Sequence, residues 1–309
     1  LSQNTLIGWD FSNADLSGSR FFQADLSDAN FANANLVASD VSRANLSGVV
    51  LTNADLTDAD MTASNYQGAN LTNAVILRAD FAGTSAGGLT PEQIYATASY
   101  KSGQLAGIDL QRNDLTGWDL SNQDLSESDF TRSTLSNVNL TNSLIPLATL
   151  EDTTSRGLVA EQIYATASYR SASLPEVDFS KNNLSEWDFS NQDLTQSSFE
   201  ESVLAGAVFR AATLHGVGFE GAQLTNTDLS QSDLTDAVFT NSRFQASVDG
   251  ADFTASVVVG ANLSKLTTSG LTAEQLYSTA SYQAFDLRNI NLSANQLEGW
   301  DFSRQNLTS

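Results

Sequence analysis

Large apolar residues recur at every fifth position along most of the chain. A small residue, most often Ala or Ser, lies two positions before most of them, Asp or Asn lies directly before, and Ser or Thr often follows. A period of five fits neither the 3.6-residue period of an amphipathic helix nor the two-residue period of a strand. The pattern therefore predicts a chain that turns a corner every five residues. The first run comprises Leu6, Phe11, Leu16, Phe21, Leu26, Phe31, Leu36, Val41, Leu46, Leu51, Leu56, Met61, Tyr66, Leu71, Ile76 and Phe81.

The repeated unit, Ala-Asp/Asn-Leu-Ser/Thr-x, resembles the pentapeptide-repeat family over most of the chain outside three insertions. The resemblance implies an all-β solenoid, a right-handed quadrilateral β-helix with four pentapeptides per coil. The central Leu or Phe and the small residue two before it then point inward, and the other three positions face water. Each buried Leu or Phe contributes about 1.5–3 kcal/mol, so a stack of them offsets chain entropy. We expect Leu46, Leu125 and Leu224 to be shielded from solvent.

Breaks in the five-residue phase divide the chain. We interpret residues 1–309 as a single solenoid with helical insertions at about 84–104, 152–173 and 265–286. A smaller break lies between Phe244 and Val248, where the step is four residues instead of five. We interpret it as a one-residue deletion absorbed in a corner.

The three insertions contain near-copies of one segment: GLTPEQIYATASY at 88–100, GLVAEQIYATASY at 157–169 and GLTAEQLYSTASY at 270–282. Each copy predicts one short α-helix.

Helix-start signals accompany the first and third copies. Thr90 is a favourable N-cap, Pro91 suits the first helical position, and Gln93 completes a capping box. Thr272 and Gln275 occupy the equivalent positions in the third copy. The middle copy has a valine where the cap belongs, which predicts weaker capping.

A Trp follows each insertion at a constant distance of eighteen residues from the final Tyr, in the slot that otherwise holds a small residue. An indole overfills such a slot, so we expect each Trp to pack near its insertion. The alternative is that the Trp marks a locally widened coil with no relation to the helix. The pairs are Tyr100 and Trp118, Tyr169 and Trp187, and Tyr282 and Trp300.

Charge and composition limit the classes of molecule that the chain can be expected to bind. The net charge of −22 argues against nucleic acid and anionic membranes, which require clustered Lys and Arg. The chain has no cysteine, which excludes disulfides and thiolate chemistry, and no apolar run approaches the roughly 20 residues of a membrane helix.

The two ends of the sequence, LSQNTLIGWDFSNADL and LSANQLEGWDFSRQNL, resemble each other and carry no polar cap. This favours a slice of a longer array or copies that stack end to end.

Candidate chemistry is sparse. His215 is the only histidine and follows a central Leu, so it is predicted to be a solvated surface residue. No phosphate loop, zinc-ligand cluster or nucleophile elbow is present, so we predict no catalytic, cofactor or metal residues and no enzyme. Asp side chains recur before central residues and form either a solvated ladder or weak sites for divalent cations. Examples are Asp109, Asp114, Asp119, Asp124 and Asp129.

Three functions remain open. The first is a non-catalytic structural or scaffolding rod, extracellular or at the cell surface, that associates with itself end to end into a filament. The second follows from the resemblance, because well-understood members of the family mimic DNA and bind type II topoisomerases, which would place the chain in the cytoplasm. The third is a cation-dependent adhesin that holds divalent cations at its Asp ladders.

Overall fold

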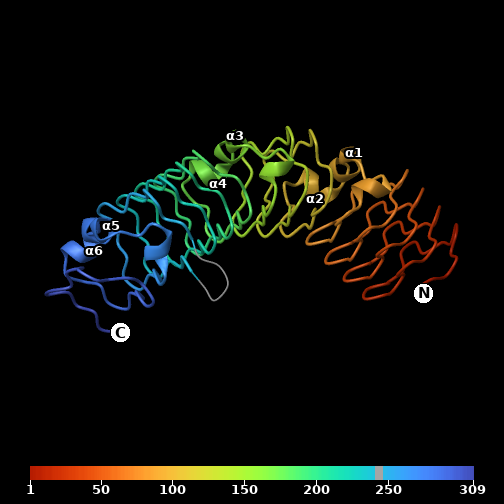
Figure 1. Cartoon of the computed structure of the whole chain (residues 1–309). Helices are drawn as coiled ribbons and strands as arrows, with labels where there is room; N and C mark the ends of the chain where they lie inside the picture. The colour runs from red at the N-terminus through yellow and green to blue at the C-terminus, as the bar shows by residue number, and fades with distance from the viewer. Residues whose placement is uncertain (241–245) are drawn as a thin grey trace. The chain divides into compact units, whose positions relative to one another are not determined.

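Stacked four-sided coils make up the chain, in a computed structural model that describes residues 1–240 and 246–309. Figure 1 shows the coils following one another from the N-terminus to the C-terminus. The chain divides into two compact units, Leu1–Ala167 and Ser168–Ser309. In the first unit, Asp25 pairs with Asn45 and Asn45 with Asn65 in parallel single-residue bridges, 20 positions apart. Twenty residues per coil at five per side give four faces. The four-sided coil is that of the right-handed quadrilateral β-helix that the resemblance implies.

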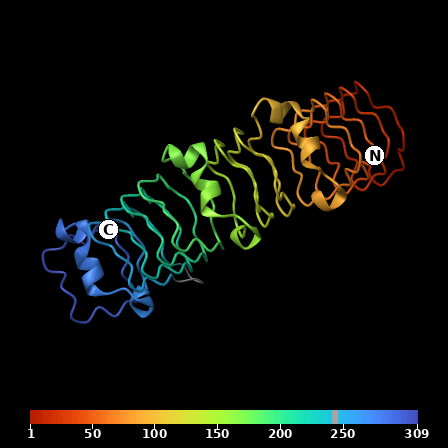
Figure 2. The same ribbon diagram turned by 90° about the horizontal axis from the view of Figure 1, so that it is seen from above.

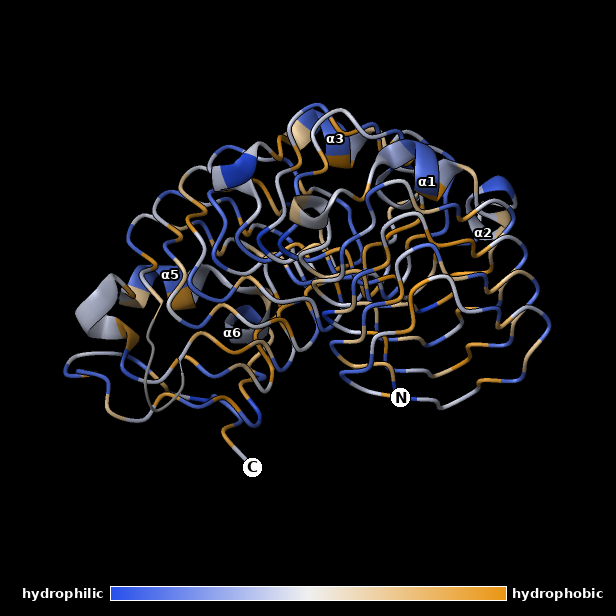
Figure 3. Ribbon diagram, turned by 90° about the vertical axis from the view of Figure 1, so that its right-hand side faces the viewer, coloured by the Kyte–Doolittle hydropathy of each residue, from blue (hydrophilic) through white to orange (hydrophobic). Residues whose placement is uncertain are grey.

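Each coil has four faces, which we name A to D after the first coil: face A is centred on Leu6, B on Phe11, C on Leu16 and D on Phe21. The central side chains point inward, as the exposed fractions of Leu46 (1%), Leu125 (0%) and Leu224 (0%) confirm. Hydrophobic and hydrophilic residues alternate along each coil, as the hydropathy colours of the ribbon show (Figure 3). The interior is thus lined by one large side chain per face.

Backbone hydrogen bonds tie each coil to both neighbours. The Leu26 N–H donates to the Asn45 carbonyl at 2.9 Å, and the Asp25 N–H donates to the Asn4 carbonyl at 2.9 Å. The corner of each face needs a left-handed residue, such as Asn33 with φ of 58°. Asn tolerates this conformation better than most residues, which explains its abundance in the repeat.

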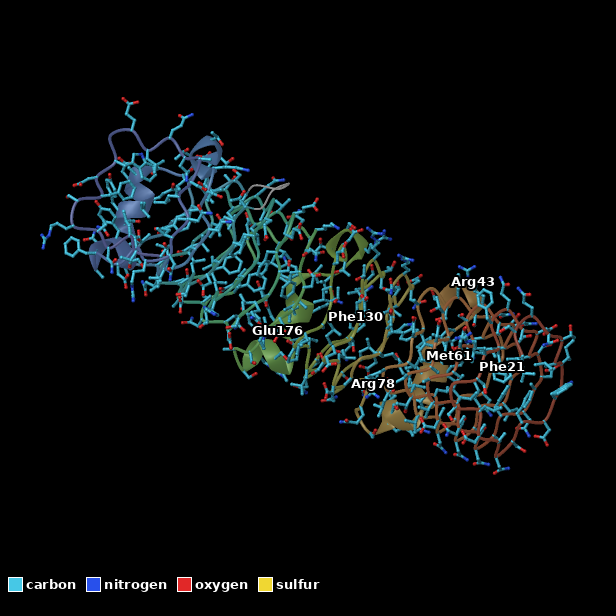
Figure 4. The ribbon with its side chains drawn as sticks, turned by 90° about the horizontal axis from the view of Figure 1, so that it is seen from below. Phe21, Arg43, Met61, Arg78, Phe130 and Glu176 are labelled. Carbon is cyan, nitrogen blue, oxygen red and sulfur yellow. The ribbon has the colours of Figure 1, made fainter. Side chains whose placement is uncertain are left out.

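The core contains columns of stacked side chains. In the second unit, the ring centroids of Phe179 and Phe199 lie 5.5 Å apart and those of Phe199 and Phe219 lie 5.6 Å apart, nearly parallel in both pairs. In the first unit, Phe21, Met61 and Phe130 occupy the centre of face D and are fully buried (Figure 4). Such spacing lets each ring contact the next coil as well as its own.

The insertions leave the coil after face D and return at face C, so each replaces faces A and B of one coil. Each holds a 3₁₀ turn and two short α-helices, where the sequence predicts one helix. In the first insertion the break is at Thr97, whose extended backbone (φ −68°, ψ 156°) ends one helix and caps the next. Figure 2 shows the helices along the wall of the coils. Their bounds are η1 Ser85–Gly87, α1 Pro91–Tyr95, α2 Ala98–Lys101, η2 Thr154–Arg156, α3 Ala160–Tyr164, α4 Ala167–Arg170, η3 Leu266–Ser269, α5 Ala273–Ser278 and α6 Ala280–Gln283.

The smaller break in the five-residue phase, before Val248, is caused by additional residues. The one-residue deletion that the sequence predicts there is wrong. Gly218 pairs with Val238, 20 positions on, whereas Gln223 pairs with Ser247, 24 positions on. The coil therefore contains four residues more than its neighbours while keeping four faces. Phe244, on which the deletion was based, lies outside the described residues.

Candidate functional site

The insertions are the main departure from the repeat, and they stay attached to the ladder of the preceding coil. Ser99 is buried, and its hydroxyl oxygen accepts from the Ile76 N–H at 2.9 Å. The Ala98 N–H donates to the Ala74 carbonyl at 2.9 Å. The end of the insertion thus pairs with the preceding coil much as an ordinary face does.

Gln93 both caps α1 and docks it on the solenoid. Its Oε1 accepts from the Thr90 N–H at 2.8 Å, which is the glutamine half of the predicted capping box. Its Nε2 donates to the Tyr66 carbonyl at 2.9 Å and to the Ala69 carbonyl at 2.8 Å. The side-chain amide of Gln93 is therefore the hydrogen-bond partner of three backbone groups.

We call this pair of bonds from one Gln side chain to two backbone carbonyls the glutamine clamp. The other two copies form the same clamp. Gln162 donates to the Leu135 and Val138 carbonyls, at 2.8 Å each. Gln275 donates to the Val248 and Ala251 carbonyls at 3.0 and 2.9 Å.

Threonine side-chain capping forms in only one of the two copies for which the sequence predicts it. Thr90 has the extended backbone of an N-cap, but its side chain accepts no cap hydrogen bond. Thr272 accepts from the Gln275 N–H at 3.2 Å and so completes the box in α5. Val159 has no side-chain acceptor, so α3 keeps only the bond from its own N–H to Gln162 Oε1, at 2.9 Å.

Trp118 packs against the insertion, with only 3% of its surface exposed. Its ring partner is Tyr95 of α1, with centroids 6.4 Å apart at 75°, and Tyr100 in turn contacts Tyr95 at 4.5 Å. The second unit repeats the arrangement, because the ring centroids of Trp300 and Tyr277 are also 6.4 Å apart. The sequence pairs each Trp with the final Tyr of its insertion, whereas the ring contact in both units is with the earlier Tyr.

The hydroxyl groups of Tyr95 and Tyr100 take the place of backbone hydrogen bonds between coils, which the insertion interrupts. In an ordinary face the bridging N–H donates to the preceding coil, as Asp124 does to Gly103. Asp119 pairs with Asn139 of the following coil, but on its other side the insertion replaces the preceding face, and the Asp119 N–H donates to the Tyr95 hydroxyl instead. The Tyr100 hydroxyl donates to the Asp119 carbonyl at 2.9 Å. Burial raises the pKa of Tyr100 to about 12, so this donor keeps its proton at neutral pH.

The final tyrosines of the other copies have the same role. The Tyr169 hydroxyl donates to the Asp188 carbonyl at 2.7 Å, close to Trp187 in sequence. The Tyr282 hydroxyl donates to the Asp301 carbonyl at 2.7 Å.

An asparagine, at least partly buried, lies where each insertion meets the coils, a region that we call the junction. Asn113 is 2% exposed, its Oδ1 accepts from the Ser85 N–H at 2.7 Å, and its Nδ2 donates to the Phe81 carbonyl at 2.9 Å. In the third junction, Asn295 accepts from the Thr267 N–H at 2.8 Å. Sequence reasoning missed these residues. The available signal was an Asn in a small-residue slot five positions before each of the three Trp residues.

A line of carboxylates follows face D of the first unit. On the other faces of this unit each bridged Asp has an uncharged partner, and the Asn30 amide, for example, donates to Asp10 Oδ1 at 3.1 Å. Face D differs: consecutive coils place one carboxylate beside the next, without an intervening amide. We call this line the acidic column. Its members are Asp40, Asp60, Asp80, Asp109 and Asp129.

Asp109 in the middle of the column differs from the solvated residue that the sequence predicts. It is half-buried, and burial raises its pKa to about 6. Hydrogen bonds from Gln111 oppose this rise, and the negative charges of Asp80 and Asp129 add to it.

The interior offers no room for a ligand near Phe130 and Ile145, where the void is about 10 Å³, smaller than a bound water requires. Across residues 1–240 and 246–309, no group of three or more His, Cys, Asp or Glu side chains is placed to hold a metal ion. No helix in these same ranges has the length and apolar character needed to cross a membrane. His215 is partly exposed on the outer wall.

The coils and junctions define a class, the β-solenoids built of five-residue faces. Profiles described as "Pentapeptide repeats (8 copies)" match residues 24–62, 54–86 and 104–142, and a "Pentapeptide repeat region" profile matches residues 172–253. These matches cover more than half of the sequence. The chain belongs to the pentapeptide-repeat family.

Solved structures of the family share low identity with the chain. HetL, a pentapeptide repeat protein involved in heterocyst differentiation regulation in the cyanobacterium Nostoc sp. strain PCC 7120, is 21% identical, with 84% of this chain and 88% of that chain covered and a TM-score of 0.28. Full-length QnrB1, a plasmid-mediated fluoroquinolone resistance protein, is 12% identical, with 98% and 91% covered and a TM-score of 0.20. A search of curated proteins found no match.

Proposed function

We propose that the chain is a non-catalytic scaffold, extracellular or at the cell surface, whose wall is a structural and binding surface. One observation carries the proposal: the polar side chains that join the first insertion to the coils are engaged with backbone groups. Gln93, Tyr95, Tyr100 and Asn113 all bind main-chain atoms of neighbouring coils. A catalytic group needs a side chain that faces a substrate pocket, whereas these side chains join coils.

Self-association is the finer part of this proposal. In a parallel solenoid each coil presents the same backbone donors and acceptors to the next, so a ladder can continue from one copy to another. Head-to-tail contacts of this kind do not close and therefore generate filaments.

Particle size tests the proposal. The purified chain is measured by light scattering and electron microscopy in dilute buffer, with and without calcium. Fibres or a concentration-dependent ladder of sizes in both buffers are expected. Clustering only with calcium would favour a cation-dependent adhesin, and a discrete dimer or monomer at all concentrations would contradict self-association.

A second candidate is a DNA mimic that binds a type II topoisomerase, as members of this family do. The net charge of −22 and the acidic column favour it, because a negative wall attracts the basic DNA-binding groove of such an enzyme. In a gel-shift competition, a DNA mimic displaces DNA from the topoisomerase, and a scaffold leaves DNA bound.

A further inference from the structure

The acidic column places the carboxylates of consecutive coils side by side. Asp80, Asp109 and Asp129 are consecutive bridge partners, so their backbones are about one strand spacing, 4.8 Å, apart. Like charges that face each other across strands destabilise a sheet.

On the other faces of the first unit an uncharged residue intervenes, as where the Asn45 amide donates to Asp25 Oδ1 at 3.0 Å. In the second unit Asp228 also pairs with Asp252, but there Arg210 lies 2.7 Å from Asp228.

The groups around Asp109 do not neutralise it. Asp80 faces it from the preceding coil and Asp129 from the following coil. Gln111, on its own coil, donates to both carboxylate oxygens, with N–H···O distances of 2.9 and 2.7 Å, but carries no charge.

Two of the nearest arginines, on the preceding and following coils, pair with other carboxylates, and Arg112 on the coil of Asp109 is not among the charges that shift the pKa of Asp109. Arg78 contacts Asp58 at 2.6 Å. Arg132 lies 4.0 Å from Glu151 and 3.6 Å from Asp152.

We propose that Asp80, Asp109 and Asp129 form a pH-responsive element, in which a proton taken up in mildly acidic solution relieves the repulsion, stabilises the first unit and lowers the charge of its wall. The proton forms an O–H on one carboxylate, which can then donate a hydrogen bond to its neighbour. This replaces a repulsive pair by the donor and acceptor pattern of the Asp–Asn pairs. The proposal concerns regulation of the wall and does not depend on what the wall binds.

The sign of the effect follows from linkage. The folded-state pKa of Asp109, about 6, lies above its ordinary value of 3.8, so the folded chain binds more protons than the unfolded chain between these values. Stability therefore rises as pH falls through about 6, which is the reverse of the usual behaviour of a paired Asp. From pH 7.5 to pH 5, this one group raises the folded-to-unfolded ratio by roughly tenfold.

The direct test is a carbon-detected NMR titration of the Asp carboxyl groups in the whole chain, with assignment by Asp109→Asn. The proposal predicts a titration midpoint near pH 6 that disappears in the variant. A spectrum in which every Asp carboxyl of the column titrates below pH 4 would overturn it.

Stability against denaturant at pH 7.5 and pH 5 provides a second readout. Asp109→Asn removes the charge and keeps one of the two oxygens that accept from Gln111, and the Gln111 amide can turn its own oxygen toward the new NH2 group. The variant is therefore expected to be more stable than the native chain at pH 7.5 and to lose the roughly tenfold gain at pH 5. The control is Asp114→Asn. Asp114 pairs with Thr134 instead of a carboxylate, and the Thr116 hydroxyl lowers its pKa, so the pH response of Asp109 is retained. Equal pH responses in the native chain and Asp109→Asn contradict the proposal.

Discussion

At the scale of single residues, the position two before each central side chain decides where the solenoid is regular. Ala and Ser fit this inner corner, as Ala24 and Ser133 do when fully buried. Trp118 and Asn113 occupy the same kind of slot and are buried as well, because an insertion replaces the preceding faces and gives them partners. A large or polar side chain in this slot is thus buried where an insertion supplies its partners.

Replacing Trp118 by Ala tests this role. The substitution removes a buried indole and leaves a cavity, so we expect a loss of about 3–5 kcal/mol in the free energy of unfolding. Trp9→Ala is the matched control, since Trp9 is in the same slot of its coil but is 53% exposed. Urea unfolding of both variants measures the difference. Equal losses would show that the insertion does not stabilise the indole.

Part of each junction was predictable from the sequence. The constant spacing between Tyr and Trp predicts that Trp118 lies one coil beyond the insertion, and the capping pattern identifies Gln93. The sequence does not show that the Gln93 amide reaches Tyr66 and Ala69, because those contacts depend on where the insertion lies over the preceding coil. Asn113 was missed for the same reason, since its partner Ser85 is 28 positions away.

At the scale of elements, each insertion acts as a substitute for two faces. Its helices are too short to be stable alone, since isolated helices below about 12–15 residues are marginal in water. They persist because Ile94 and Ser99 are buried in the coil and because side chains supply the missing backbone bonds. One helix was predicted where α1 and α2 form, because the sequence pattern gives Thr97 no mark that separates a cap from a mid-helix residue.

Gln93→Leu tests the docking of α1. The change keeps most of the side-chain volume but leaves the Thr90 N–H and two carbonyls without their partner. An unsatisfied buried group costs about 1–3 kcal/mol, so the insertion should open locally. Amide hydrogen exchange across residues 84–104 is expected to accelerate.

The control for this change is Glu92→Gln, which alters the adjacent exposed side chain and keeps the clamp. Slow exchange in Gln93→Leu, matching that in Glu92→Gln, would mean that the amide does not hold the helix.

At the scale of the whole molecule, the five-residue repeat accounts for both the apolar core and the polar outer wall. A hydrophobic side chain at every fifth position fills the interior, and residues 20 apart pair between coils. The fold was predictable because this periodicity runs through most of the sequence. The acidic column was not, because the pairing of Asp80 with Asp109 spans an insertion that shifts the offset to 29 positions.

Disulfide cross-linking tests the central claim, the four-sided coil, and the absence of native cysteine makes the result unambiguous. Asn45 and Asn65 are bridge partners 20 positions apart, and their side chains are in contact at 3.0 Å. The expected backbone separation of about 4.8 Å lies within disulfide range. The Asn45→Cys/Asn65→Cys variant should therefore oxidise rapidly within one chain. The Asn45→Cys/Asp55→Cys variant places cysteines two faces apart and should stay reduced. Rapid oxidation of the second pair, with none in the first, would contradict the four-sided coil.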